Sequence, residues 1–334
     1  MKKRLLAIIL SMTLFVLSVV GVGAVDATNE ADTFSMVSMN FATGVETEST
    51  FELTDSELEL IEEVVLSRKA PFDVTATPTL QTGFESGNSS RAIIGDSDGR
   101  TPVANESQYP YSAIAYIEMV WPSLNPEEGP IASGTAFMIS DSLALTSAHC
   151  IYNKNLGGWP VSIAAFPGKK GIGFWNDPYG STYCYIGEGY VCSDYISALE
   201  EGIAPYVKDD WAIIRLINPL GEDTGKFILD TLDNSQIIGA SIKLCGYPGD
   251  LGICEQFEMV GSIHAYDSGV LYYNMDSNDG QSGSPVFNIN PNSNGEYVVY
   301  GIHQGNSVSM GYNRCVRITQ NIINIVNNKI AEYE

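Results

Sequence analysis

The sequence predicts an all-β protein made of two antiparallel barrels followed by a C-terminal helix. From Ala92 to the C-terminus, short apolar runs alternate with turn-forming Gly, Asn, Asp and Pro residues, which is the pattern of antiparallel strands joined by short loops. Strands and helices do not alternate along the chain, so a doubly wound parallel sheet is not expected. The 243 residues of this part are enough for two small barrels.

The first 24 residues have the organisation of a secretory signal peptide. Lys2, Lys3 and Arg4 form a positive start, residues 5–20 are almost continuously apolar, and residues 22–24 form a small-residue cleavage site. A membrane anchor is the alternative, because the apolar run is nearly long enough to span a bilayer. We favour the signal peptide, since the cleavage site lies where the apolar run ends. We therefore expect a secreted, extracellular protein with no stable membrane anchor after signal cleavage.

Residues 25–91 differ from the rest of the chain and are predicted to form a pro-segment. They contain 13 of the 40 acidic residues. Residues 54–57 form a capping box, and apolar residues recur at helical spacing over 58–65, so one amphipathic helix is expected. A Gly/Ser/Asn linker follows at 83–90. A lone helix with a linker cannot bury a core, so we expect the pro-segment to end near Arg91; a disordered spacer is the alternative.

Residues 92–334 are predicted to form the folded domain, with one barrel at about 92–220 and the second at about 221–316. The expected strands include 112–118, 136–139, 212–216, 241–244, 297–302 and 315–318. One convincing helix follows, with an apolar face made of Ile318, Ile322, Ile325 and Val326.

Charge and composition exclude several classes of function. The chain has 17 Lys and Arg against 40 Asp and Glu, a formal net charge of −23. Binding to nucleic acid through a basic patch is therefore excluded, because phosphate contacts need clustered basic residues. An anionic membrane surface is disfavoured for the same reason. An apolar content of 44% excludes wholesale disorder.

The six cysteines have two possible interpretations. An even number in an exported chain indicates disulfides, and sequence proximity suggests Cys184–Cys192 and Cys245–Cys254. The alternative is that some of them are thiols. The sequence contains no Cys-x-x-Cys pair and its three histidines are far apart, so we expect no structural zinc site and assign no metal-ligating residue.

Three short segments carry side chains that could act together. His149 follows an apolar strand, Asp209 and Asp210 precede another, and Ser282 lies in the glycine-flanked run Gly280–Pro285. Serine attack on a carbonyl needs a base to take the hydroxyl proton and an acid to orient the base. Each segment alone is a weak signal, but the order His, Asp, Ser at separations of 61 and 72 residues predicts such a site. That order excludes the subtilisin and α/β-hydrolase arrangements.

Four motifs carry a family resemblance: Ile94-Gly95 with Asp98–Thr101, Gly246–Asp250, Gly280–Phe287 and Gly301–His303. With these motifs, the chain from about residue 93 to its end resembles the bacterial glutamyl endopeptidases, secreted serine proteases of the chymotrypsin fold, and especially their bacillary branch. The resemblance implies two six-stranded antiparallel β-barrels and a serine endopeptidase made as a zymogen.

The resemblance also implies roles for individual residues. The amides of Gly280 and Ser282 would form the oxyanion hole. The acid would be Asp210 rather than Asp209, because the family places it directly before a large apolar residue and Ala. The residue before the serine is Gln281, whereas animal trypsin-like zymogens have an Asp there that pairs with the new N-terminus, so that switch is missing.

The residues implied for S1, the pocket that binds the P1 side chain, support two different specificities. By resemblance, His303, Ser277 and the new amino group of Ala92 would bind a P1 glutamate. Taken alone, Asp276 at the pocket base suggests a basic P1 residue by charge pairing. Asp279 adds negative charge nearby and could weaken the binding of an acidic side chain.

The leading hypothesis is a secreted endopeptidase that cleaves after Glu and less readily after Asp. The alternatives are the same catalytic residues with a basic or small P1 preference, and an inactive protease-like binding protein. We expect protein or peptide substrates, a monomer, and no cofactor. The sequence leaves a structural calcium ion open.

Overall fold

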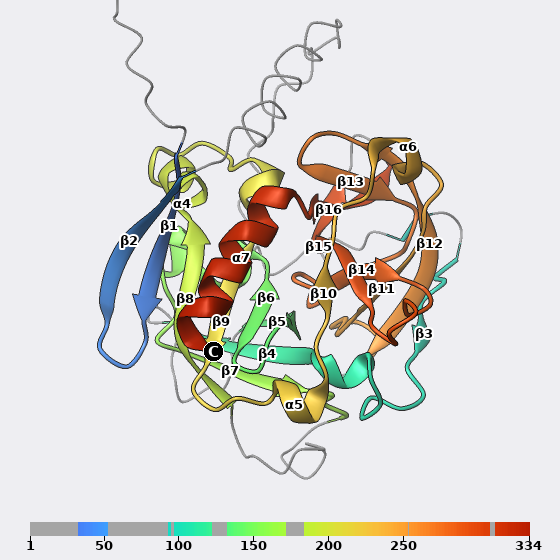
Figure 1. Ribbon diagram of the computed structural model, residues 1–334, viewed down its shortest axis with the longest axis horizontal. Coiled ribbons are helices and arrows are strands. Elements are labelled where there is room, and N and C mark those ends of the chain that lie inside the picture. Colours follow the sequence, from blue (N-terminus) through green and yellow to red (C-terminus); the bar gives the residue numbers. More distant parts are fainter. Residues whose placement is uncertain are drawn as a thin grey trace, which may run out of the picture. The chain divides into compact units, whose positions relative to one another are not determined.

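Two antiparallel sheets, each closed into a six-stranded barrel, and a C-terminal helix make up the fold seen in the computed structural model (Figure 1). The structure describes residues 33–52, 93–94, 97–121, 132–171, 184–252, 254–307 and 311–334. The predicted fold class is confirmed. The signal peptide, the helix expected over residues 54–65, the linker 83–90, Arg91 and Ala92 lie outside the described residues.

The first barrel is closed by the pairing of β8 with β9, in the order β8-β7-β4-β5-β6-β9. Its apolar side chains, such as Ile117, Phe137 and Ile213, are fully buried and fill the interior. Its strands are β4 (Ile114–Val120), β5 (Ala132–Met138), β6 (Leu143–Thr146), β7 (Ser162–Pro167), β8 (Cys184–Cys192) and β9 (Ala212–Leu216).

The second barrel is closed by the pairing of β15 with β16, in the order β15-β14-β11-β12-β13-β16. Leu244, Ile263 and Val286 are among the side chains buried inside it. Its strands are β11 (Ser241–Gly246), β12 (Phe257–Tyr266), β13 (Val270–Tyr273), β14 (Pro285–Asn288), β15 (Val298–Ser307) and β16 (Tyr312–Arg317). Two short strands join its sheet: β3 (Thr101–Pro102) pairs with β12, and β10 (Ile228–Leu229) runs parallel to β15.

The C-terminal helix α7 spans Gln320–Tyr333 and begins at the cap residue Thr319. Its buried residues include Ile322, Ile325 and Val326, as expected. Ile318 is also buried but precedes the cap, and its N–H donates to Tyr300 O, so it prolongs the sheet rather than belonging to the helix. The remaining helices are short: α3 (Ala148–Ile151), α4 (Ser193–Glu200), α5 (Gly221–Thr224), α6 (Asn234–Ile237), and the 3₁₀ turns η1 (Tyr111–Ala113), η3 (Lys154–Leu156) and η5 (Val207–Asp209).

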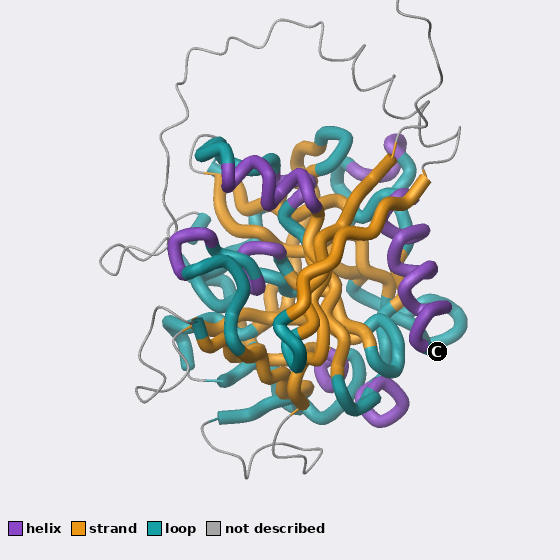
Figure 2. Tube along the Cα trace, turned by 90° about the vertical axis from the view of Figure 1, so that its left-hand side faces the viewer, coloured by secondary structure: helices purple, strands orange, loops and turns teal. Residues whose placement is uncertain are grey.

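A β-hairpin lies within the segment that the sequence assigned to a pro-segment with one helix. It consists of β1 (Thr33–Asn40) and β2 (Val45–Glu52), and β1 pairs with β8 of the first barrel. In Figure 2 its two strands run along the front of the molecule. The expectation of a helix and polar linker therefore missed two strands, which place Met36 in the core of the first barrel rather than forming a core of their own.

All six cysteines are buried thiols, so both suggested disulfides are wrong. Cys184 and Cys192 are the two ends of the nine-residue strand β8. At about 3.3 Å per residue their Cα atoms lie roughly 26 Å apart, whereas a disulfide needs ~4.4–6.8 Å. Cys245 lies in β11, where its Sγ donates to Gln256 Oε1 (3.7 Å).

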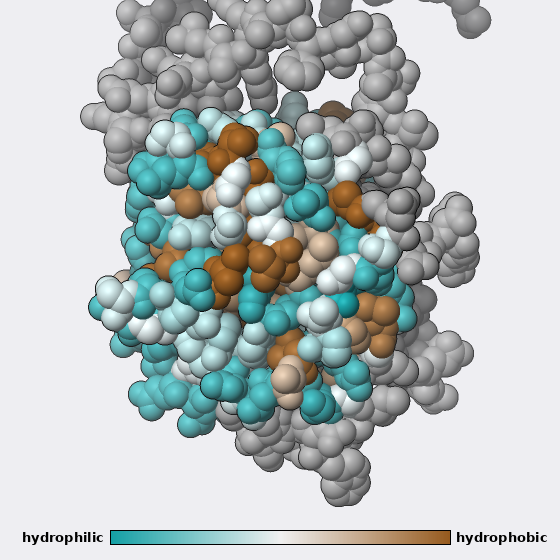
Figure 3. All heavy atoms as spheres, turned by 90° about the vertical axis from the view of Figure 1, so that its right-hand side faces the viewer, coloured by the Kyte–Doolittle hydropathy of each residue, from teal (hydrophilic) through white to brown (hydrophobic). Residues whose placement is uncertain are grey.

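The face shown in Figure 3 is largely hydrophilic, with apolar side chains in small separate patches. Scattered apolar side chains of this kind are normal on a protein surface and indicate no binding face by themselves. Within the described residues, no helix is both long and apolar enough to cross a membrane.

Candidate active site

His149 and Asp210 come from neighbouring strands of the first barrel and meet at one end of it. His149 lies in α3, directly after β6, and Asp210 lies directly before β9, which pairs with β6. Nδ1 of His149 is 2.7 Å from Asp210 Oδ2, and the backbone N–H of His149 donates to Oδ1 at 2.9 Å. The imidazole side chain keeps 30% of its surface exposed, whereas that of Asp210 keeps 5%. One ring edge is therefore fixed by a carboxylate while the ring itself remains reachable.

The two groups shift each other's pKa. Burial disfavours the imidazolium, but the charge of Asp210, its hydrogen bond and the neighbouring Cys150 together outweigh this and raise the pKa of His149 well above its ordinary value. Burial would raise the pKa of Asp210, but the charge of His149 and hydrogen bonds from His149 and Gln304 lower it. Asp210 is thus held as a carboxylate. Asp209 instead forms an ion pair with Lys208 (2.8 Å) and does not contact His149.

Gln304 and Arg314 support Asp210, and sequence reasoning missed both. Arg314 Nε donates to Gln304 Oε1 at 2.8 Å, so the Gln304 amide nitrogen is the group that donates to Asp210. Gln304 directly follows His303 on β15, at a point where the pairing of β15 with β16 is irregular. The period-two alternation of a regular strand therefore does not mark it, and the sequence carries no local signal for its contact with Asp210.

Ser282 lies in a tight loop that contacts β5 and α3, the short helix that carries His149. Ser282 O accepts from Thr135 N (2.9 Å) and from the thiol of Cys150 (3.7 Å), the residue after His149. Within this loop Gly280 adopts φ +93°, and its carbonyl accepts from Thr135 Oγ1 (2.8 Å). In the part of the chain that the structure describes, no acceptor takes the N–H of Gly280 or Ser282, and the Ser282 hydroxyl makes no hydrogen bond to His149. Two N–H groups are therefore available beside the serine.

His303 is buried on β15 of the second barrel, with its ring against Tyr273. The Tyr273 hydroxyl lies 2.5 Å from His303 Nδ1. Burial, with a smaller effect from nearby His149, lowers the pKa of His303 to about 3. The ring is therefore neutral at neutral pH. Ser277, the other described residue expected in the pocket, is also buried. In the chain it lies directly after Asp276.

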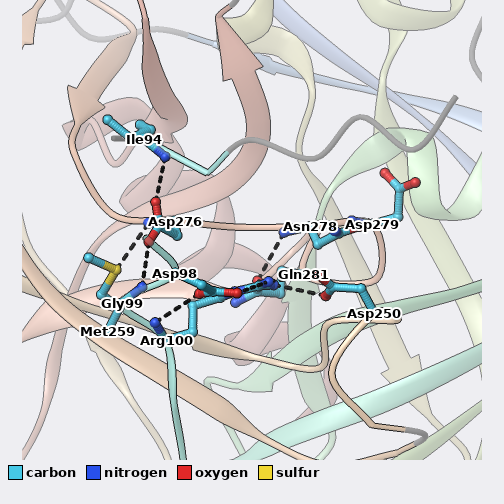
Figure 4. Close-up of polar contacts among 10 residues, drawn as sticks. All are labelled: Ile94, Asp98, Gly99, Arg100, Asp250, Met259, Asp276, Asn278, Asp279 and Gln281. Carbon is cyan, nitrogen blue, oxygen red and sulfur yellow. Dashed lines mark hydrogen bonds and ion pairs between the residues drawn. The ribbon is translucent and has the colours of Figure 1, made fainter. Parts of the chain in front are cut away.

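Asp276 does not present a free carboxylate to a basic side chain. Its Oδ1 accepts from Ile94 N (2.6 Å) and its Oδ2 from Gly99 N (2.7 Å) (Figure 4). A Cβ on Gly99 would lie 2.7 Å from Met259 Cε, the end of a flexible side chain. Asp279 is exposed, and in Figure 4 its carboxylate points away from Asp276. The charge-pairing argument for a basic P1 residue therefore loses its basis.

Arg100 connects the N-terminal segment 94–100, which also holds Ile94 and Gly99, to Gln281, the residue before Ser282. Its guanidinium is fully buried, with ion pairs to Asp98 (2.8 Å) and Asp250 (2.7 Å), and it donates to Gln281 Oε1 (3.3 Å). Burial would lower the pKa of Arg100, but the hydrogen bonds and charges of the two carboxylates raise it. Arg100 is thus a permanent cation beside the serine loop (Figure 4).

One cluster among the described residues has the composition of a metal site. The Cys192 thiol and the carboxylates of Asp194 and Asp209 place their ligand atoms within 4.8 Å of one another. However, Lys208 Nζ already occupies Asp209 Oδ1, and burial raises the pKa of Cys192 to about 12, so the thiol keeps its proton. These residues do not fit a metal ion.

Comparison with known proteins gives the chain its relatives. No family model matches it. A glutamyl endopeptidase of Bacillus licheniformis is 32% identical over 248 residues, covering 71% of this chain and 69% of that protein. An extracellular metalloprotease of Bacillus subtilis is 27% identical over 233 residues, covering 70% and 68%. The structure of a Glu endopeptidase in complex with MPD matches with a TM-score of 0.58 and 28% identity, covering 72% of this chain and 99% of that one. With this identity, coverage and shared fold, the chain belongs to the glutamyl endopeptidases, serine endopeptidases of the chymotrypsin fold.

Proposed function

We propose that this protein is a secreted serine endopeptidase, made as a zymogen, that cleaves peptide bonds after glutamate and less readily after aspartate. It acts on protein or peptide substrates as a monomer and without a cofactor. For catalysis, the proposal depends on one observation: His149 Nδ1 contacts the Asp210 carboxylate, and the Ser282 loop contacts Cys150, the residue after His149.

In the proposed mechanism, Nε2 of His149 takes the proton of Ser282 Oγ as this oxygen attacks the carbonyl carbon of the substrate. Asp210 fixes the tautomer and stabilises the imidazolium that forms. The N–H groups of Gly280 and Ser282 bind the oxyanion of the tetrahedral intermediate. His149 then gives its proton to the leaving amine, and water hydrolyses the acyl-enzyme with the same base.

The P1 carboxylate of the substrate would be bound by His303, Ser277 and the new amino group of Ala92. The Tyr273 hydroxyl lies within reach of both His303 Nδ1 (2.5 Å) and Arg314 O (3.2 Å). In this proposal it donates to Nδ1, so that Nε2 carries the proton and donates to the substrate. Because His303 is neutral at neutral pH, it contributes a hydrogen bond but no charge. The ammonium of Ala92 is then the cation that pairs with the buried P1 carboxylate. Without it, the carboxylate would lose its hydration and gain no charged partner.

This division of roles explains why a zymogen would be weakly active. Ile94 is anchored on Asp276, and two residues reach at most about 7 Å, so a chain cut after Arg91 would bring its new amino group close to the pocket. In the uncut chain this position is an uncharged amide. We therefore expect the precursor to bind a P1 glutamate poorly.

The test compares fluorogenic peptides that differ only in P1 as Glu, Gln, Arg or Ala. The wild-type enzyme should prefer Glu, and Ser282→Ala should lose activity by on the order of 10⁶ in kcat. Ser284→Ala is the matched control, since its buried hydroxyl has no partner among the described residues, and it should retain activity. Preference for Arg would overturn the glutamate assignment, and an active Ser282→Ala enzyme would overturn the nucleophile.

A further inference from the structure

The hairpin of β1 and β2 precedes Arg91 in the chain but is built into the sheet of the first barrel (Figure 2). β1 pairs antiparallel with residues 188–192 of β8, from Met36 opposite Cys192 to Asn40 opposite Glu188. The pairing continues at the turn, where Phe41 N donates to Gly187 O (2.9 Å). Main-chain ladders of this kind are how a sheet edge binds an added strand.

Apolar contacts reinforce this ladder. Met36 is fully buried in the core of the first barrel. The ring of Phe34 stacks on Trp211 at 6.0 Å and 17°, and the ring of Phe41 meets Trp159 edge-on at 6.3 Å. Trp211 directly follows the proposed catalytic acid, so the hairpin covers the residue next to it. Loss of the hairpin would open part of the barrel core to water.

Polar contacts fix the register of the hairpin. Trp159 Nε1 donates to Glu46 Oε2 (2.7 Å), and Asn40 Nδ2 donates to Glu188 Oε1 (3.2 Å). The Ser193 hydroxyl donates to the Ser35 carbonyl oxygen (2.9 Å). A one-residue slip would turn every side chain to the opposite face and break these contacts together. The hairpin is thus held in one specific position.

We propose that the hairpin 33–52 stays bound after the chain is cut near Arg91, so that the mature enzyme consists of two chains. The occupant of the β8 edge is this segment of the same gene product, and the contacts with the barrel named above go to residues beyond Ala92. The inference rests on the proposed function in one respect, since processing near Arg91 is what would separate the two chains.

Native and denaturing mass spectrometry of the secreted enzyme test this proposal. The native mass should equal that of residues 92–334 plus a fragment containing residues 33–52, and denaturation should separate the two. A native mass of residues 92–334 alone would overturn the proposal. A single unbroken chain under denaturing conditions would instead count against processing near Arg91. Retention is then tested by replacing part of the linker 83–90 with an introduced protease site and cutting the folded protein there.

Variants identify the surface that holds the hairpin. In the cut protein, Met36→Asp should weaken retention at least ~100-fold, because it buries a charge without a partner. Val45→Asp is the matched control, since Val45 is an exposed residue of the same hairpin, and it should stay bound. Equal retention of both variants would overturn the proposed surface.

If Met36→Asp fails to fold, hydrogen exchange decides the question on the cut wild-type protein. Within residues 188–192, the amides that face β1 rather than β9 should exchange as slowly as in the uncut chain. A rise to the rate of an open strand edge would show that the hairpin leaves, and would overturn the proposal.

Discussion

Replacing Arg100 with methionine should damage both stability and turnover, because this buried cation joins the N-terminal segment to the serine loop. Arg100 forms ion pairs with Asp98 and Asp250 and donates to Gln281. Methionine has a similar length but none of these donors. The change therefore leaves the two carboxylates without their cation and removes one of the two donors on Gln281 Oε1, the other being Asn278 N (3.1 Å).

The size of the stability loss follows from burial. Removing one partner of a buried ion pair costs about 3–5 kcal/mol. The side chains of Asp98 and Asp250 keep 21% and 27% of their surface exposed, so water can take over part of the lost interaction. We therefore expect a loss near the lower end, about 3 kcal/mol, or a fall in Tm on the order of 6–10 °C.

The effect on turnover follows from the position of Gln281 between Gly280 and Ser282, the two proposed oxyanion donors. Misplacing one such donor costs up to ~10²–10³ in kcat. Because Asn278 still holds Gln281, we expect a fall nearer the lower limit, roughly 10²-fold, with little change in KM. The loss concerns the transition state rather than P1 binding, so peptides with Glu and Gln at P1 should fall by the same factor.

The assay measures kcat and KM per folded molecule, with the folded fraction taken from circular dichroism and Tm. Arg317→Met is the matched control, since this guanidinium bonds Leu232 O (2.9 Å) and Asn234 Oδ1 (3.1 Å), remote from the serine loop. It should lose stability but keep its kcat. If Arg100→Met keeps full kcat per folded molecule, Arg100 has only a structural role and the argument fails.

Three further predictions concern the site itself. Because the pKa of His149 is raised and only the neutral ring accepts a proton, the acid limb of the kcat/KM profile should lie above pH ~6.5; Asp210→Asn should move it to lower pH while kcat falls by ~10⁴, and an unmoved limb would separate Asp210 from this titration. His303→Ala should lower kcat/KM for P1 Glu by roughly 10-fold or more, through loss of a hydrogen bond to a charged group, but much less for P1 Gln; equal losses on both peptides would mean that His303 only packs. Gly280→Ala should lower kcat by ~10² or more, since its Cβ would lie 2.4 Å from Tyr247 O at φ +93°; unchanged kinetics would exclude Gly280 from the oxyanion hole.

The sequence predicts most of the barrels because their strands are marked locally. Apolar alternation and turn residues are visible within a few residues, so the run 212–216 coincides with β9 and 241–244 begins β11. The site residues were named from the order of three short segments. The partners of Asp276 were not predictable, since its carboxylate is bound by backbone N–H groups 182 and 177 residues away in the chain. Backbone groups carry no sequence signal.

The hairpin and the cysteines show two other reasons for failure. Glu46, Glu48 and Glu52 all lie at even positions of the run 45–52, which is consistent with the period of a strand, but the acidic content of the segment suggested a polar pro-segment. Sequence proximity alone suggested a pairing of Cys184 with Cys192. In a strand, however, closeness along the chain means a long separation in space. Spacing indicates a disulfide only after the local structure is known.

The contacts around the serine loop separate two tasks that one switch performs in animal trypsin-like zymogens. Asp276 and Gln281, at the two ends of the loop, are bound by Ile94, Gly99 and Arg100. These three residues follow the proposed cleavage site, so cutting the chain there neither creates nor removes their contacts. What cutting would add is the ammonium of the new N-terminus, in a pocket whose histidine is neutral. In the proposed function, processing therefore acts on recognition of the P1 carboxylate, while the serine loop keeps its support in both forms of the chain.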